Sequence, residues 1–351
     1  MLIYFFLVLI IYFSLNVTRE IGLVKKWNVM DIFVLSIMIA FAGFRYYVGT
    51  DYGGYLYIYN NVVSRVFSLS DYRSTNHEIG FYFLSWVTKN VSDSPYAIFW
   101  TSAIITYLPI YVRLKKDSNN FPFALLLYFL LGFYTFSFNG IRQSIAISIS
   151  FYASRYMNIN HKKFILINII ASLFHLSAFV AFIIQILVSN IKSLRKFLFI
   201  SLFILLTFLF VWYKKPAFVM NFLYNINPKY LYYFTPKPTN IGVKLQIFLR
   251  FLTIVYVFLF TDRNVYTFYK FLLIISLIFL FLGLYMVFLA RFEMYFSIYL
   301  TLLLPEAIRN ISSKEDKILH QYILFAVFFI VFILSLLYYN EVIPYKTYLT
   351  M

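Results

Sequence analysis

Arg142 stands in the short polar stretch FNGIRQSIA (residues 138–146), between two strongly apolar runs of the chain. An arginine beside a bilayer is energetically expensive and usually functional, although one near the end of a span costs less than one at its centre. The alternative is an interfacial side chain that extends along the helix to reach water. Asn139 precedes Arg142 by three residues, so a helix would place both on one face. The sequence alone leaves both interpretations open.

A glycine-rich segment, GFRYYVGTDYGGYLYIY, brings a second arginine close to a carboxylate. Four of the ten glycines of the chain fall within a dozen positions here, so we expect tight turns: Gly43, Gly49, Gly53 and Gly54. Arg45 and Asp51 would then form an anion-binding group and a carboxylate base in one loop. The alternative is that Arg45 reaches the membrane interface while Asp51 caps the next helix.

The composition indicates which elements must hold these residues. The chain has 351 residues, of which 62% are hydrophobic, 23% aromatic and only 12% charged, and its mean hydropathy is +0.80. A soluble domain cannot hide that much apolar surface. The apolar runs are continuous rather than alternating, which favours helices over a transmembrane barrel. We therefore predict an all-α, polytopic integral membrane protein with roughly 11–12 transmembrane helices.

One membrane domain is expected to cover residues 1–351, with a long external loop at 45–95 and a second large loop at 214–244. The second loop is basic and aromatic, so it either caps a carbohydrate site or lies at the membrane interface. The expected spans are residues 2–18, 28–44, 96–113, 121–138, 141–157, 163–189, 197–213, 245–262, 267–289, 291–309 and 318–339.

The net charge of +17 is carried mainly by short loops between spans, so it reports topology and contact with anionic lipid rather than nucleic-acid binding. Basic residues place the loops at 19–26 and 113–120 in the cytoplasm, which puts Arg142 at the external face. Residues 79–91 are too short to span, and we expect an amphipathic or re-entrant helix on the external side. The run 163–189 is longer than one span needs, so we favour a fold-back near His175.

An ordered set of motifs resembles the EpsG family of bacterial exopolysaccharide proteins, which are similar to Wzy-type polysaccharide polymerases. The set covers nearly the whole chain, and its members are Arg45, GTDY with Tyr55 following, EIGF at Glu78, NGIRQ at Asn139 to Gln143, SLFHLS at His175, RFEMYF at Arg291 and IPY at Tyr345. The resemblance implies polymerisation of undecaprenyl-pyrophosphate-linked oligosaccharide repeat units on the external face of the cytoplasmic (inner) membrane. Such units serve exopolysaccharide, capsule or O-antigen synthesis.

For a lipid diphosphate sugar, the charge that develops on the pyrophosphate must be stabilised as the glycosidic bond breaks. Arginine suits phosphate oxygens because its planar guanidinium donates two parallel hydrogen bonds. We expect this group to be bound by Arg142, Arg45, Arg291, Asn139 and Gln143. Arg291 can alternatively be an interface or packing residue.

The acceptor hydroxyl must be deprotonated or oriented by a carboxylate or an imidazole. Three residues compete for that role: Asp51, Glu78 and His175. We slightly prefer Asp51, because its loop is positioned to line a cavity. A histidine within an apolar run, such as His175, is equally often a buried, hydrogen-bonded residue. The chain has no cysteine, its four histidines show no metal-ligand spacing, and it lacks a glycine-rich phosphate loop. We therefore expect neither metal nor cofactor.

Two other functions remain as alternatives at this point. A flippase or exporter of lipid-linked oligosaccharides would also place cations in an apolar cavity, but such proteins usually carry paired repeats, and none is evident here. A membrane acyltransferase would need a catalytic histidine, a role that only His175 could fill. The expected partners are the lipid-linked donor and acceptor and bilayer lipid, with room for a chain-length regulator and a flippase.

Overall fold

The computed structural model describes residues 1–20, 27–75, 77–215, 217–226, 241–262, 267–338 and 341–350, and most of these are helical. Within these ranges β-type pairing is limited to one isolated antiparallel bridge, between Arg45 and Thr347. The predicted all-α class is therefore confirmed. The chain divides into two compact units, one made of residues 1–180 with 304–351 and the other of residues 181–303.

The first unit is built mainly from helices before residue 180. In chain order these are α1 (Leu2–Glu20), α2 (Val29–Gly43), α3 (Tyr52–Tyr57), the π-helix η1 (Ile58–Val62), α4 (Leu69–Thr75), α5 (Ile79–Val91), α6 (Ala97–Asp117), α7 (Phe121–Leu130), α8 (Phe133–Phe136), α9 (Ile141–Ala153), η2 (Ser154–Tyr156), α10 (His161–Phe174) and the start of α11 (Ser177–Ser189). The later part of the chain adds most of α18 (Leu300–Arg309), α19 (Lys314–Tyr338) and η4 (Tyr348–Thr350).

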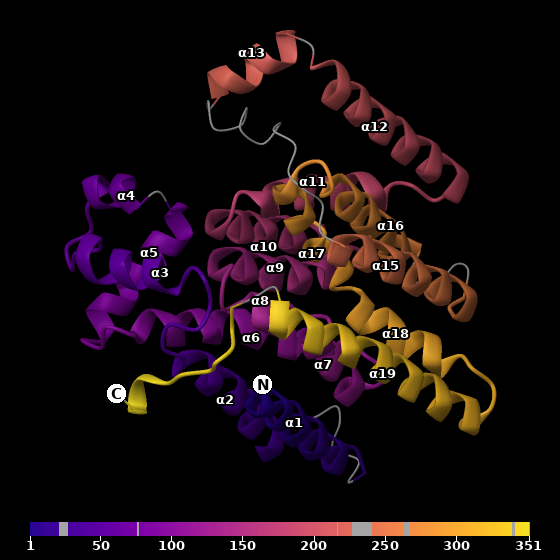
Figure 1. Cartoon of the computed structure of the whole chain (residues 1–351), viewed down its shortest axis with the longest axis horizontal. Helices are drawn as coiled ribbons and strands as arrows, with labels where there is room; N and C mark the ends of the chain where they lie inside the picture. The colour runs from indigo at the N-terminus through magenta and orange to yellow at the C-terminus, as the bar shows by residue number, and fades with distance from the viewer. Residues whose placement is uncertain are drawn as a thin grey trace. The chain divides into compact units, whose positions relative to one another are not determined.

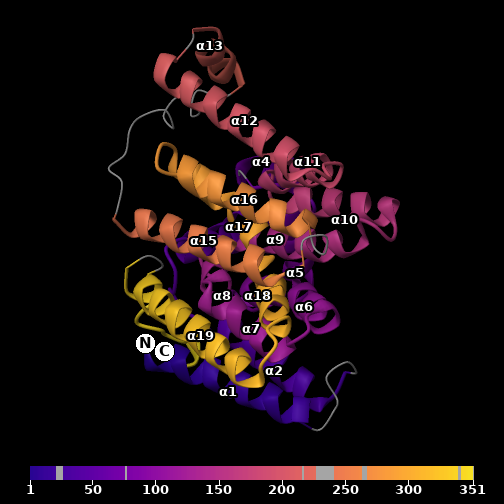
Figure 2. The ribbon, with the colours of Figure 1, turned by 90° about the vertical axis from the view of Figure 1, so that its right-hand side faces the viewer.

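Helix α6 is the centre of this unit, because it packs against α2, α5, α7 and α9. Helix α7, FPFALLLYFL, is apolar on every side, and all ten of its residues are buried. Helices α1 and α19 cover it and lie beside it in both views of the ribbon (Figures 1 and 2). Helices α3, α4 and α5 gather at one end of α6, α9 and α10 (Figure 1).

A buried ion pair joins the start of α2 to the last turn of α6. The Lys115 ammonium lies 2.6 Å from both carboxylate oxygens of Asp31, and the Tyr111 hydroxyl donates to the same carboxylate at 2.8 Å. Asp31 also completes a capping box with Asn28 at the start of α2. These bonds stabilise the negative charge of Asp31, whose burial without a partner would destabilise the fold.

The second unit contains the rest of α11, then α12 (Leu194–Lys214), α13 (Ala217–Ile226), α15 (Ile241–Phe260), α16 (Thr267–Leu282), η3 (Val287–Arg291), α17 (Met294–Ser297) and the start of α18. Helix α16 packs against α12, α15, η3 and α17. About half of the predicted loop 214–244 lies outside the described residues, and part of the rest forms α13, so its role stays a prediction.

Among the described residues, four helices are long and apolar enough to cross a membrane: α6, α12, α15 from Gly242 onward, and α19. Five shorter apolar helices accompany them, in α1, α2, α7, α11 and α16. Helix α6 is mostly buried inside the protein, whereas α12 and α19 expose large aliphatic and aromatic side chains. Exposure of this kind is what a lipid environment stabilises, and it agrees with the predicted polytopic membrane protein.

Several predicted spans are interrupted in the structure. Residues 121–138 form α7 and α8, which are separated at Gly132, where a φ of +82° ends the first helix in the left-handed conformation. The run 163–189 forms α10 and α11, with the break at His175 and Leu176 that the sequence indicated. The predicted span 291–309 is divided into α17 and α18.

The predicted external loop 45–95 is largely helical. Helix α5 covers residues 79–91, as predicted, and its 13 residues are too few to span a bilayer. A tight turn is confirmed at Gly49, whose φ is +99°. The expected turns at Gly53 and Gly54 are wrong, because both residues lie inside α3 with no positive φ.

Candidate functional site

Arg142 forms an ion pair with Glu78. Arg142 lies in the first turn of α9, as predicted, and Glu78 is the residue that precedes α5. Both side chains are 24% exposed, so the pair is neither fully solvated nor sealed in the core. An arginine that is held this way is not a free interfacial side chain, and its position is set by two helices.

A close approach of two backbones positions Glu78. Its second carboxylate oxygen accepts a hydrogen bond of 3.3 Å from the amide of Leu176, in the break between α10 and α11. Two residues further on, Gly80 packs directly on the last turn of α10, where a Cβ would lie 2.6 Å from the carbonyl oxygen of Leu173. Only glycine permits this distance, so Gly80 allows α5 to present Glu78 to Arg142.

Two tyrosines of α3 contact the two arginines of this region. The buried Tyr55 hydroxyl is hydrogen-bonded to Arg142, and the ring of the buried Tyr52 lies 5.8 Å from the guanidinium of Arg45. Burial raises the pKa of Tyr55, and the charge of Arg142 offsets part of that rise. Sequence reasoning assigned no role to either tyrosine, although their three-residue spacing after GTD was a usable signal.

His77 completes the surroundings of the ion pair. Its imidazole packs against the ring of Tyr55 at 5.6 Å and that of Phe81 at 5.3 Å. Burial, together with the nearby positive charge of Arg142, lowers the pKa of His77 to about 4. The imidazole is therefore neutral at physiological pH, and it adds no second cation beside Arg142.

Asp51 occupies the position before α3, but its side chain makes no capping hydrogen bond there. It is exposed, and its nearest polar contact is the Thr50 hydroxyl at 3.5 Å. Its loop is held at the start of α9, since the amide of the adjacent Thr50 donates to the side chain of Asn139 at 2.7 Å. The capping explanation for Asp51 therefore does not hold, and its proposed role as a base stays a prediction.

Arg45 is buried, with 2% of its surface exposed, rather than extended to an interface. Its guanidinium lies 4.7 Å and 4.8 Å from the ring centres of Phe99 and Phe138 and donates to the carbonyl of Ala42 at 2.5 Å. Its Nε has no hydrogen-bond partner among the described residues. No carboxylate of the described residues pairs with this guanidinium, and the cation–π contacts stabilise its charge instead.

The backbone around Arg45 is fixed by the C-terminal segment. The amide of Tyr46 donates to the carbonyl of Lys346 at 2.9 Å, and the amide of Tyr348 donates to the carbonyl of Phe44 at 3.2 Å. Tyr345, from the IPY motif, stacks on Phe41 at 4.1 Å and donates to its carbonyl at 2.6 Å. The last residues of the chain therefore help to hold the arginine in place.

The two amide residues of the NGIRQ motif lie differently from the prediction. Asn139 precedes α9, so it does not share a helical face with Arg142; its side-chain oxygen accepts the Thr50 amide at 2.7 Å. This bond joins the start of α9 to the loop that carries Asp51. Gln143 is 3% exposed inside the helix packing. The predicted binding roles of both remain untested.

His175 lies at the break between α10 and α11, beyond the last turn of α10. Its Nδ1 accepts the Ser177 amide at 3.2 Å and contacts the Ser177 hydroxyl at 2.6 Å. It follows Leu173, the residue that Gly80 contacts, and precedes Leu176, whose amide donates to Glu78. The structure thus brings His175 to the segment that holds Glu78.

Arg291 belongs to the second unit, where it ends η3 and is exposed. The carboxylate of Glu293 forms a buried ion pair with Arg250 of α15 and not with Arg291. Arg250 was given no role from the sequence alone. The pair is explained by burial, since a lone carboxylate inside the packing of α15, α16 and α17 would be strongly destabilising.

The first unit thus gathers one set of chemical groups at one end of α5 and α9: Arg142, Glu78, Tyr55, His77 and Asp51. A guanidinium can bind a phosphate oxygen, and a carboxylate can accept a proton. Within the described ranges, no group of three or more histidine, aspartate or glutamate side chains is suited to a metal ion.

Comparison with known proteins identifies the family but no individual relative. No curated protein and no solved structure matches this chain. The model of the EpsG family matches residues 28–347, which is most of the chain and includes every motif residue discussed above. The chain therefore belongs to the EpsG family, a family of Wzy-like polysaccharide polymerases.

Proposed function

We propose that this protein polymerises undecaprenyl-pyrophosphate-linked oligosaccharide repeat units at the external face of the cytoplasmic membrane. The observation that carries the proposal is the Arg142–Glu78 ion pair, half-buried beside Tyr55 and Asp51 in a membrane protein of the EpsG family. A guanidinium and carboxylates at one site supply both functions that glycosyl transfer from a diphosphate requires, which are leaving-group stabilisation and proton acceptance.

The reaction transfers the growing chain from its own lipid diphosphate to the sugar of an incoming unit. The acceptor oxygen forms a bond to the anomeric carbon, and the bond from that carbon to the pyrophosphate oxygen breaks. The electron pair leaves with the lipid pyrophosphate, whose added charge Arg142 neutralises. The hydroxyl proton passes to a carboxylate of the protein.

The ion pair suggests how binding and proton transfer are linked. A pyrophosphate oxygen competes with Glu78 for Arg142, so the substrate that arrives partly releases this carboxylate from its guanidinium partner. Asp51 remains the favoured base, because its carboxylate is exposed and makes no capping bond. His175 serves as an orienting group in this scheme, since it lies in the break between α10 and α11 whose Leu176 amide donates to Glu78.

Arg142→Ala tests the proposal in cells, with protein level measured in membranes. We expect loss of polymer and accumulation of single lipid-linked repeat units on the outer leaflet. Arg65→Ala is the matched control, because Arg65 pairs with Asp93 in the same region and is 60% exposed. Units trapped on the inner leaflet would indicate a flippase, and normal polymer would show that Arg142 is not part of the machinery.

A further inference from the structure

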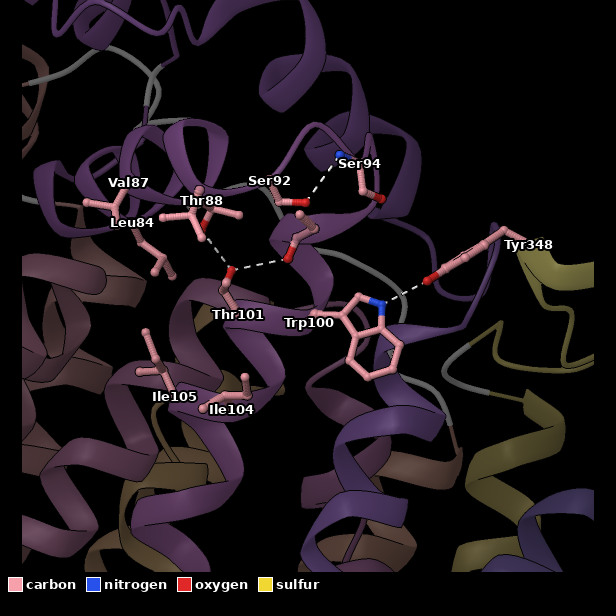
Figure 3. Close-up of a pocket in the computed structure, with 12 residues that line it drawn as sticks. Leu84, Val87, Thr88, Ser92, Ser94, Trp100, Thr101, Ile104, Ile105 and Tyr348 are labelled. Carbon is pink, nitrogen blue, oxygen red and sulfur yellow. Dashed lines mark hydrogen bonds between the residues drawn. The ribbon is translucent and has the colours of Figure 1, made fainter.

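A groove of about 530 Å³ lies between the last two turns of α5 and the first half of α6 (Figure 3). Its surface is mainly apolar, with side chains of the two helices facing each other across it. None of the residues that line it is charged. The principal wall residues are Leu84, Val87, Ile104 and Ile105.

The polar groups in its wall make hydrogen bonds to one another or to nearby backbone. Thr88 donates to Thr101 at 3.0 Å, and the indole N–H of Trp100 donates to the hydroxyl of Tyr348 at 2.9 Å (Figure 3). A sugar would need free donors and acceptors to replace its bonds to water. Each hydroxyl and indole group in the wall already makes at least one hydrogen bond within the protein, and the rest of the surface is apolar, so the groove suits a hydrocarbon chain better than a sugar.

The groove includes exposed residues of α6, and it lies further along α5 than the ion pair. Ile104, in the groove, and Leu108, one turn further along α6, are 43% and 40% exposed on a helix long enough to cross a membrane. Leu84 lies six residues after Glu78, or roughly 9 Å along α5 at the usual helical rise. Leu84 and Ile105 also pack on the apolar cluster that contains Tyr55.

The distribution of charge therefore fits one amphiphile. Arg142 of α9 pairs with Glu78 at the start of α5, and an uncharged apolar surface follows along α5. We propose that the groove holds the polyprenyl chain of the lipid-linked substrate while its diphosphate contacts Arg142; this rests on the proposed function. A polyprenyl diphosphate carries its phosphates directly at the end of the chain, so one molecule reaches both places, whereas a phospholipid separates them by a glycerol ester.

Photocrosslinking tests this assignment on the full-length protein in nanodiscs. The probe is a sugar-free polyprenyl diphosphate with a diazirine in its first isoprene units, and the labelled peptides are mapped by mass spectrometry. We expect labelling of residues 84–105. Ile104→Trp fills the groove and should reduce labelling there about tenfold, equivalent to about 1.4 kcal/mol. Leu108→Trp adds the same indole on the exposed face beyond the groove and should leave labelling unchanged.

Three results would overturn the assignment. Labelling could map outside residues 84–105, or it could persist in Ile104→Trp. Alternatively, excess phosphatidylglycerol could abolish labelling as effectively as unlabelled polyprenyl diphosphate does. The last result would identify the groove as an ordinary phospholipid site. The probe carries no sugar, so its capture does not require polymerisation. Labelling in the groove together with repeat units trapped on the inner leaflet in Arg142→Ala cells would therefore refute the proposed polymerase function and leave the chain site standing.

Discussion

Gly80→Ala should reduce polymerisation without removing any chemical group from the site. The added Cβ would lie 2.6 Å from the carbonyl oxygen and 2.8 Å from the carbonyl carbon of Leu173. Both are backbone atoms of α10, so no side-chain rotation relieves the clash. Helix α5 must move away from α10, and Glu78, two residues before Gly80, must move with it.

The size of the effect follows from that distance. Ordinary contact begins at 3.4 Å, so the helix must shift by about 0.8 Å. Overpacking of this kind costs about 1–3 kcal/mol of stability. A displacement close to 1 Å in a catalytic group lowers rates by up to about a hundredfold. We therefore expect polymer output to fall between about tenfold and a hundredfold at equal protein level.

Gly54→Ala is the matched control, since Gly54 lies in α3 of the same region and an added Cβ there meets nothing within 4 Å. Alanine is also about 1 kcal/mol better than glycine within a helix. The assay compares polymer length and the pool of lipid-linked units in cells that carry either variant, normalised to the amount of protein in membranes. Detergent-solubilised protein gives the melting temperature of each.

The reasoning fails if Gly80→Ala cells make normal polymer. It also fails if the two alanine variants lose polymer to the same extent, because only Gly80 touches a neighbouring backbone. A low melting temperature with little protein in membranes would show that the contact serves folding, which would remove the positioning role assigned to it.

Three further changes test other contacts. Tyr55→Phe removes the hydroxyl bonded to Arg142 and should lower polymer output about tenfold. Tyr52→Phe is the control and should leave the output unchanged, because the Tyr52 hydroxyl has no hydrogen-bond partner among the described residues. Equal outputs from the two variants would contradict this. Lys115→Met leaves its buried carboxylate partner unpaired and should lower the free energy of unfolding by about 3–5 kcal/mol, measured by denaturant titration in detergent. The pKa of His77, about 4 against 6.5 when unfolded, means that the unfolded state binds more protons between these values. The contribution of the neutral His77 to the free energy of unfolding is therefore fully present above pH 6.5 and is lost as the pH falls to 4, by up to about 3 kcal/mol. His77→Phe should flatten the dependence of the free energy of unfolding on pH in this range, and an unchanged dependence would refute the lowered pKa of His77.

The fold class and most helix positions could be predicted from the sequence, because they depend on local composition. Long apolar runs form helices wherever lipid or protein must surround the backbone, and the charged loops divide these runs. The short helix at residues 79–91 and the break at His175 followed from length alone. The interruption at Gly132 did not, since a glycine within an apolar run is compatible with either a helix or a turn.

The site was predicted less completely than the fold. Residue type identified Arg142, Glu78 and Asp51 as candidates, because charged groups in apolar surroundings are rare and expensive. The pairing of Arg142 with Glu78 spans 64 positions of sequence, and no local pattern encodes it. Sequence reasoning therefore left Glu78 as one of three competing bases and gave no role to Tyr55.

Arg45 is a second residue whose surroundings could not be predicted from the sequence. Its type and its glycine-rich neighbourhood suggested an exposed anion-binding group, but it is enclosed by Phe99 and Phe138 and fixed by residues near the end of the chain. The sequence by itself determined which residues carry charge and which segments are helical, because both depend on residue type and near neighbours. Only the tertiary structure decided which charges meet, since burial and ion pairing depend on helices that lie far apart along the chain.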